Sequence, residues 1–289
     1  MKIAHSMYTP PLHRRGTNGN LEYQRLFAAN SLYYTISALL LRKHGISPVL
    51  FCDEEALKVG KIDESLYERV IVLPDERISK LSPRFWASGK FACYAHPEWQ
   101  SDWVHIDGDV FFLKPDLLEV IRQDKSDVLI QDLEVEQGYE EITRPVKDIF
   151  LNQPFLQLPA STAENAVSYN VGVISVRNNE LRKKYVDTYF AVAQKMTDCA
   201  NLAQYHKMTV DLFAEQEVLA LLSKKYTTKT LLPDFAVRTE FRENDELGFR
   251  HYTGTLKYMP ANLKERLELL KTLDAERFNN FRDLLNIQG

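Results

Sequence analysis

The stretch Trp103–Leu113, with the sequence WVHIDGDVFFL, decides how this chain folds. Its first four residues are mostly apolar and predict a buried strand, and the residues VFFL resume the same pattern after an acidic turn. Two carboxylates, Asp107 and Asp109, therefore lie inside an apolar run. An unpaired buried charge is costly, so these acids need a partner. The stretch predicts a strand that ends at two carboxylates sharing one partner.

Strands and helices alternate on both sides of this stretch. Apolar runs of strand length lie at Lys2–Tyr8, Val49–Cys52, Val70–Leu73, Val110–Leu113, Val128–Ile130 and Tyr169–Val176, with a last short strand at Leu231–Leu232. Helical patterns lie at Leu21–His44, Phe85–His96, Glu180–Thr197 and Thr209–Lys225, with shorter helices after Asp53 and Pro115 and a helical tail at Pro260–Leu285. This alternation predicts an α/β fold with a central, mostly parallel sheet flanked by helices.

The segment Gln131–Val167 breaks this regularity. It is rich in acids and prolines, and it is expected to be an insertion or loop region with a helix near Val146–Leu151. The chain has no internal repeat, low-complexity segment or recognisable linker. A single domain over residues 1–289 is therefore the simplest organisation.

The composition is that of an ordinary globular protein and excludes several classes. The 36 basic and 40 acidic residues give a formal net charge of −4, which provides no global field for binding nucleic acid. A hydrophobic content of 45% argues against disorder. The three widely spaced cysteines suggest neither a zinc site nor a disulfide scaffold. No signal peptide is evident and no apolar run approaches the roughly 18 residues of a transmembrane segment, so a cytoplasmic protein is expected.

The sequence Asp107-Gly108-Asp109 carries the clearest chemical signal. Two carboxylates separated by one small residue can converge on one cation, and oxygen ligands of this kind suit magnesium or manganese. Such a cation would bridge to phosphates, and Gly108 would let a ligand approach the backbone closely. The alternative is an Asp-Gly turn that joins two strands of an ordinary hairpin.

In this context the segment VHIDGDVFFLKPDLLEV resembles the D-x-D region of GT-A glycosyltransferases. Upstream, SLYYTISALLLRKHG and PVLFCDEEA resemble the first helix and second strand of that family, and Trp86–Tyr94 resembles the helix before its D-x-D strand. On that helix Lys90 is the basic residue that would approach the donor. Its alternative role is a solvated helix charge. The opening residues and HIDGDVFF also resemble uncharacterised bacterial relatives of these enzymes.

Three downstream segments are similar to the retaining galactosyltransferase and glycogenin-like branch. These are SYNVGVISV with Asn170 and Gly172, the segment Glu215-Gln216-Glu217 in place of D-Q-D, and HYTGTLK with its H-x-x-G-x-x-K pattern. Without the resemblance, the first would be a core strand with one buried Asn, the second the polar face of a helix, and the third a set of surface residues. The chain departs from the family at the His5-Ser6 region, where an acidic residue is usual, and at Tyr258-Met259-Pro260.

The resemblance assigns a role to each of these residues. The metal, Mn²⁺ or Mg²⁺, would be held by Asp107, Asp109 and His251. The donor and its diphosphate would be bound by Lys90, Asp107, Gly108, Gly172, Gly254, Lys257 and Ser6. The catalytic residues would be Gln216 and Asn170, which would address the donor sugar.

The resemblance implies a GT-A-like single domain and a metal-dependent glycosyltransferase. Residues 1–130 would form the nucleotide-binding half, 131–259 the acceptor-side half and 260–289 a C-terminal helical tail. A sugar would pass, with retention, from a nucleotide-diphosphate sugar such as a UDP-sugar to a saccharide or glycolipid acceptor, as in polysaccharide biosynthesis. Two alternatives remain: a non-catalytic nucleotide-sugar-binding protein on the same fold, and a metal-dependent hydrolase of nucleotide sugars or phosphodiesters.

The remaining polar features have less specific interpretations. Arg14 and Arg15 belong either to a phosphate-facing loop or to a mobile surface loop. The acids Asp132, Glu134 and Glu136 include a candidate general base, although a solvated acidic loop is favoured, and the histidines His96 and His206 are expected to be structural. The leucines of the tail, Leu263, Leu267, Leu270 and Leu273, have helical spacing and mixed flanking charges, which favours docking onto the chain itself over peripheral membrane contact.

Overall fold

The protein is described here by a computed structural model that covers residues 1–9, 21–60, 62–73, 76, 78–134, 139–150, 168–199, 209–232, 244–252 and 256–285. Its strands are β1 (Lys2–Met7), β2 (Val49–Cys52), β3 (Arg69–Val72), β4 (Trp103–Ile106), β5 (Val110–Phe112), β6 (Val128–Glu134), β7 (Ser168–Val176), β8 (Thr228–Thr230) and β9 (Phe249–His251). Its helices are α2 (Leu21–Lys43), α3 (Glu54–Gly60), α4 (Ser88–Ala95), α5 (Asp116–Gln123), α6 (Tyr139–Phe150), α7 (Asn179–Thr197), α8 (Thr209–Asp211), α9 (Val218–Leu222), α10 (Pro260–Leu273) and α11 (Ala275–Leu285). A π-helical turn, Leu212–Glu217, joins α8 to α9, and short 3-10 turns occupy Glu64–Leu66, Ser223–Lys225 and Leu256–Tyr258.

Seven of these strands form a central sheet in the order β3-β2-β1-β4-β7-β6-β8. The pairs β2–β3, β1–β2, β1–β4 and β6–β8 are parallel, whereas β7 runs antiparallel to both β4 and β6. Strands β5 and β9 form a separate two-stranded antiparallel sheet. The predicted α/β fold with a mostly parallel sheet is therefore confirmed.

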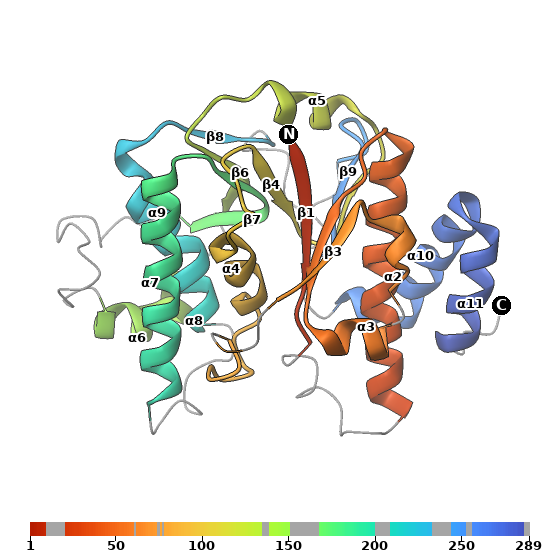
Figure 1. The fold of residues 1–289 in the computed structure, drawn as a ribbon, viewed down its shortest axis with the longest axis horizontal. Coiled ribbons are helices and arrows are strands. Elements are labelled where there is room, and N and C mark those ends of the chain that lie inside the picture. The colour runs from red at the N-terminus through yellow and green to blue at the C-terminus, as the bar shows by residue number, and fades with distance from the viewer. Residues whose placement is uncertain are drawn as a thin grey trace.

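Helices cover both faces of the central sheet, as Figure 1 shows with α4, α7 and α9 on one side and α2, α10 and α11 on the other. Alternate strand residues supply the two cores: Ala4 and Phe51 join the cluster on the α4 and α7 side, while Met7 and Leu50 join a cluster with α2. This period-two alternation is what a sheet buried on both faces requires. The long helix α2 ends where predicted, because Gly45 adopts a positive φ of 75° just after its last turn.

Several element bounds differ from the sequence prediction. Residues Gln131–Glu134 continue strand β6 instead of opening an irregular insertion, because β7 supplies ladder partners as far as Glu134. The last strand of the sheet is β8, and Leu231–Leu232 lie just beyond its end. Helix α6 begins earlier than predicted and helix α4 is shorter. Strand β9 was not predicted, since three residues carry too weak a pattern.

The strand order reverses between β1 and β4, and we call the edge of the sheet at the carboxyl ends of these two strands the crevice. After β1 the chain builds β2 and β3 on one side, and it then returns to add β4 on the other side of β1. In open α/β sheets, ligands bind outside the carboxyl ends of the strands at such a reversal of strand order. Asp107 follows β4 directly and so lies at this position.

Candidate functional site

The acids Asp107 and Asp109 lie on the turn between two strands that belong to different sheets. The hairpin interpretation of this turn is therefore wrong, because β4 pairs with β1 and β7 while β5 pairs with β9. The N–H of Asp107 donates to the carbonyl of Gly172 (2.8 Å), and the N–H of Tyr252 donates to the carbonyl of Asp109 (3.0 Å). Both acids are thus held at the crevice by backbone hydrogen bonds from two sheets.

Strand β9 brings His251 to these carboxylates. Its pairing with β5 sets His251 opposite Val110, one residue beyond Asp109. One ligand atom each from Asp107, Asp109 and His251 lies within 4.8 Å of the others. His251 lies more than a hundred positions from the two aspartates in the sequence. In the structure the three residues are close enough to share one cation.

Glycines make this approach possible. A Cβ on Gly172 would collide with the imidazole of His251, meeting Nδ1 at 2.8 Å, and with the side-chain oxygen of Gln131. A Cβ on Gly108 would collide with the ring of Tyr34. Both glycines were expected to admit a ligand, and in the structure each admits a side chain that shapes the site.

Two lysines complete the cluster, Lys90, which is buried, and Lys257, which is partly buried. Nζ of Lys90 lies 2.9 Å from Oδ1 of Asp107 and 2.6 Å from Oε1 of Glu215, and it also donates to the carbonyl of Val171 (3.2 Å). Nζ of Lys257 lies 2.6 Å from Oδ2 of Asp109. Lys90 is 7% exposed, so its interpretation as a solvated helix charge is wrong.

The charges around the two aspartates differ, and so do their pKa values. Burial opposes ionisation of Asp109, but Lys257 and His251 outweigh it, so the pKa of Asp109 lies well below its ordinary value. Burial raises the pKa of Asp107 despite Lys90, and the nearby charge of Asp109 raises it further. A cation bound next to Asp107 would stabilise the ionised form of this carboxylate, which burial and Asp109 disfavour.

The residues of this cluster fit a divalent metal. Two carboxylate oxygens and an imidazole nitrogen are ligands that Mn²⁺ and Mg²⁺ sites use, with water or substrate oxygens completing the shell. Nδ1 of His251 is buried and has no hydrogen-bond partner among the described residues. The other ring nitrogen, Nε2, lies 3.5 Å from Oδ1 of Asp109 and so faces the carboxylates.

The segment Glu215-Gln216-Glu217 lies on the π-helical turn and is not the polar face of a helix. Glu215 and Glu217 are each 2% exposed, and Glu215 pairs with Lys90 as described above. Gln216 is half-buried, and its Oε1 accepts a hydrogen bond from Ser168 Oγ at 3.0 Å. Glu215 also belongs to the cluster, although the sequence predicted a role only for its neighbour Gln216.

The other predicted residues surround this cluster. Asn170 is buried, and its Oδ1 accepts from the N–H of Gly172 (2.9 Å), which supports the strand next to His251. Ser6 Oγ lies 2.8 Å from Nε2 of His105. Tyr33 donates to the carbonyl of Lys257 (2.7 Å) and fixes that lysine against α2. The predictions for Gly254, Arg14, Arg15, Glu136, His206 and the side chain of Glu134 lie outside the described residues.

Two further expectations can be compared with the structure. Asp132 is 1% exposed within β6, so the solvated-loop interpretation is wrong for this residue. The tail docks onto the chain itself, as expected, because Leu263, Leu267 and Leu270 are buried in a cluster with α2. Among the described helices, none combines the length and apolar character that crossing a membrane requires.

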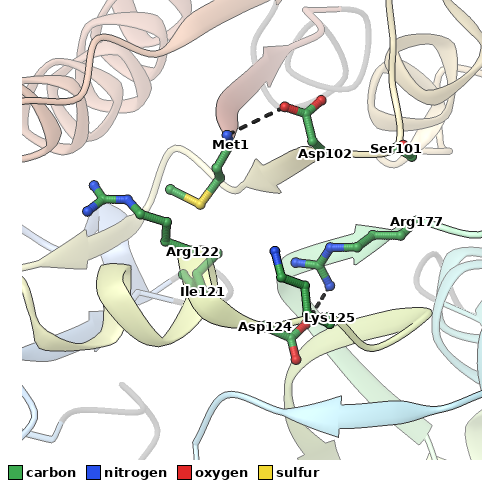
Figure 2. Close-up of a pocket in the computed structure, with 8 residues that line it drawn as sticks. All are labelled: Met1, Ser101, Asp102, Ile121, Arg122, Asp124, Lys125 and Arg177. Atoms are coloured by element: carbon green, nitrogen blue, oxygen red, sulfur yellow. Dashed lines mark hydrogen bonds and ion pairs between the residues drawn. The ribbon is translucent and has the colours of Figure 1, made fainter.

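A surface pocket of about 180 Å³ lies at the opposite end of the sheet, near the beginnings of β1 and β4 (Figure 2). Its charged groups form ordinary ion pairs: the amino group of Met1 lies 3.4 Å from Asp102, and Arg177 pairs with Asp124. Carboxylates and a histidine do not converge there as they do at Asp107. Within the described part of the chain, the group of side chains that could hold a metal ion lies at the crevice beside β4.

Comparison with known proteins identifies the fold and the family. The chain belongs to the family described as "Family of unknown function (DUF6734)", which matches residues 1–283. The crystal structure of the galactosyltransferase LgtC in complex with donor and acceptor sugar analogs is similar, with a TM-score of 0.52 at 11% sequence identity. That match covers 97% of this chain and 100% of LgtC. No curated protein matches significantly. The fold is thus that of a GT-A glycosyltransferase.

Proposed function

We propose that this protein is a metal-dependent glycosyltransferase that moves a sugar from a nucleotide-diphosphate sugar to a hydroxyl acceptor. A UDP-sugar is the proposed donor, a saccharide or glycolipid the proposed acceptor, and retention the proposed stereochemical outcome. The observation that carries the proposal is the convergence of Asp107, Asp109 and His251 beside Lys257, at the reversal of strand order. The likeness to a galactosyltransferase fold supports it.

Each residue of the cluster has a definite task in this proposal. Asp107, Asp109 and His251 would hold Mn²⁺ or Mg²⁺, which when bound supplies the charge that stabilises a departing diphosphate. Lys257, a compact point charge next to Asp109, would bind the diphosphate together with the Gly254 backbone. Two lysines and a divalent cation would outweigh the carboxylates of Asp107, Asp109 and Glu215 by one positive charge, which favours an anionic diphosphate.

The donor sugar would lie between β7 and the π-helical turn. Lys90 and Glu215 form a charged pair next to Asp107 and can address sugar hydroxyls, and Gln216 presents a half-buried amide from the same turn. Asn170 supports the strand on the other side. We also propose the division of labour expected from the resemblance, with a nucleotide-binding half in residues 1–130, an acceptor-side half in 131–259 and a helical tail in 260–289.

The proposal is tested by nucleotide-sugar turnover. A panel of UDP-sugars is incubated with Mn²⁺, with and without a saccharide acceptor panel, and UDP release is measured for the parent and Asp109→Asn. A transferase shows slow release that an acceptor accelerates, and Asp109→Asn abolishes both rates. Rapid release that no acceptor changes would indicate a hydrolase, and binding without release a non-catalytic protein. If calorimetry detects no binding of metal or of nucleotide sugar to the parent, the proposal fails.

A further inference from the structure

His105 is a fully buried histidine on the strand that leads to Asp107. Its side chain is 0% exposed, and its backbone on β4 is paired with Ala4 of β1 and Ile174 of β7. The ring of Tyr94 from α4 packs against it edge to face, with the ring centroids 5.7 Å apart. A histidine enclosed in this way must satisfy both of its ring nitrogens within the protein.

The two ring nitrogens of His105 face two polar groups of the crevice. Nε2 lies 2.8 Å from Oγ of Ser6 on β1, which is hydrogen-bond distance. Nδ1 lies 3.6 Å from Oδ1 of Asp107. That separation is longer than a hydrogen bond, and Nδ1 has no hydrogen-bond partner among the described residues. The ring nitrogen that needs a partner is therefore the one that faces the candidate metal ligand.

Electrostatics decides which of the two nitrogens carries the hydrogen. A neutral imidazole has one N–H group and one lone pair. With the hydrogen on Nε2, the lone pair of Nδ1 would point at the carboxylate of Asp107, and the two would repel each other. With the hydrogen on Nδ1, the ring offers a donor to Asp107 and an acceptor to the hydroxyl of Ser6. The second tautomer satisfies all three groups.

We propose that His105 is a positioning residue, which donates from Nδ1–H to Oδ1 of Asp107 and so orients this carboxylate for the metal. This inference rests on the proposed function and adds a residue that supports its metal site. Oδ1 of Asp107 also lies 2.9 Å from Nζ of Lys90, so two donors would fix one oxygen of the carboxylate. Shortening the 3.6 Å separation to a hydrogen bond takes about half an ångström. Partners of this kind orient the ligands of many metal sites.

The order Ser6, His105, Asp107 is also that of a hydrolase triad, in which the serine is the nucleophile. That chemistry requires the imidazole to become positively charged when it takes the proton of the serine. Lys90, with its Nζ 2.9 Å from Asp107, disfavours a second positive charge here. The effect of His105 therefore falls on the carboxylate and not on the serine.

The tautomer of His105 tests the inference directly and without metal. Long-range ¹H–¹⁵N NMR spectra of the ¹⁵N-labelled protein distinguish a ring nitrogen that carries hydrogen from one that does not. The signals of His105 are those that disappear in His105→Asn or in His105→Gln. Hydrogen on Nδ1 is expected, whereas hydrogen on Nε2 would overturn the proposal. Because this measurement is made on the parent, it holds even if one of the variants fails to fold.

The same two substitutions separate positioning from packing. Asparagine places its amide about where Nδ1 lies, whereas glutamine places it about where Nε2 lies. Mn²⁺ affinity by calorimetry should therefore fall about tenfold in His105→Gln and markedly less in His105→Asn. A role in packing alone predicts the opposite order, because asparagine is the smaller side chain and leaves the larger cavity. That opposite order, or equal affinities, would contradict the proposal.

A pair of serine variants tests the contact at Nε2. Ser6→Ala removes the group that holds the tautomer of His105, so it should weaken Mn²⁺ binding, but less than His105→Gln does. Ser175→Ala is the matched control, because it removes a hydroxyl that donates to the carbonyl of Trp103 (2.9 Å). Mn²⁺ affinity should be unchanged in this control. Equal effects of the two serine variants would contradict the role of Ser6.

These measurements distinguish the inference from the proposed function. If the parent binds Mn²⁺ and UDP by calorimetry but His105 carries its hydrogen on Nε2, the positioning role fails and the transferase proposal stands. If the parent binds neither Mn²⁺ nor UDP, the transferase proposal fails, and the positioning role for the metal fails with it.

Discussion

The π-helical turn carries two glutamates, Glu215 and Glu217, and each forms a buried ion pair with a lysine from another helix. The two pairs differ in the residues that surround them. Lys90 and Glu215 are 2.6 Å apart, and Lys147 of α6 and Glu217 are 2.7 Å apart. Both glutamates are 2% exposed. Lys90 is shared with Asp107 at the crevice, whereas Glu217 accepts a second contact from Thr143 of α6. One pair belongs to the candidate site, and the other fastens α6 to the turn.

The comparison teaches that burial of an ion pair does not by itself mark a functional site. Both pairs must offset the same desolvation cost, and such pairs occur in structural as well as catalytic positions. What distinguishes Lys90–Glu215 is the convergence of further charges, since Asp107, Asp109 and His251 lie beyond it. The π-helical turn that carries both glutamates is a rare conformation often found at functional sites.

The largest expected effect is the loss of transfer activity and of metal binding when Asp109 is replaced. Asp109→Asn removes a candidate metal ligand and the partner of Lys257, so transfer activity should fall by at least about a thousandfold. Mn²⁺ affinity by calorimetry should be lost as well. Asp102→Asn, at the opposite end of the sheet beside Met1, is the matched control and should leave both unchanged. If both variants bind Mn²⁺ like the parent, the crevice is not a metal site.

The second prediction concerns the separate replacement of Glu215 and of Glu217 by Gln. Glu215→Gln should reduce kcat/KM about a hundredfold with little change in stability, because Lys90 keeps Asp107 as a partner. Glu217→Gln leaves Lys147 buried without its carboxylate and should lower the free energy of unfolding by about 3 kcal/mol, with activity retained. Urea denaturation and steady-state kinetics measure the two effects. If Glu217→Gln lost activity while Glu215→Gln lost only stability, Glu217 rather than Glu215 would belong to the functional site.

Gly172 tests whether His251 must approach the backbone closely. In Gly172→Ala the new methyl group would displace the imidazole, and Mn²⁺ affinity should fall about tenfold. Gly89→Ala is the matched control, because its methyl group would press on Tyr8 instead. Gly89→Ala should be destabilised by overpacking, but it should bind Mn²⁺ more tightly than Gly172→Ala does. Equal losses of affinity in the two variants would indicate a general disturbance of the fold.

The smallest effect belongs to an ion pair at the far end of the sheet, between Asp124 and Arg177 (Figure 2). Burial opposes ionisation of Asp124, but hydrogen bonding by Ser126 and the charge of Arg177 outweigh it, so its pKa is lowered. A lowered pKa stabilises the fold at pH values above the unfolded pKa, and this contribution disappears as the pH falls through the folded pKa.

Asp124→Asn should cost about 1 kcal/mol near neutral pH, because the amide fills the same buried position but lacks the charge that faces the partly exposed Arg177. Below about pH 4 the parent and the variant should converge in stability. Thermal denaturation between acid and neutral pH measures the difference. If the difference in stability between the parent and Asp124→Asn grew as the pH fell, the pKa of Asp124 would not be lowered in the folded protein.

Much of the fold follows from local patterns in the sequence. Strand-length apolar runs such as Val49–Cys52 and Trp103–Ile106 were predicted to the residue, because a sheet covered on both faces needs continuous apolar strands. The long helix was predicted to within one residue, since Gly45 supplies a local stop signal. The carboxylate pair was also evident, because charges inside an apolar run are rare.

The unpredicted features depend on contacts between distant segments. Nothing near Phe249–His251 indicates that it pairs with β5, so only the resemblance brought His251 to Asp109. The burial of Glu217 depends on Lys147, which is seventy positions away. Helical periodicity alone assigned this glutamate to a polar face. Such pairings are set by tertiary packing, which a local pattern does not contain.

The central claim is that the crevice beside β4 holds a divalent metal and a nucleotide diphosphate. Crystals soaked with UDP and Mn²⁺ test it directly, because manganese is located by its anomalous scattering. A single anomalous peak is predicted at bonding distance from Asp107, Asp109 and His251, with the diphosphate next to Lys257. Crystals that bind neither manganese nor UDP at these residues, or that bind them elsewhere on the protein, would contradict the account.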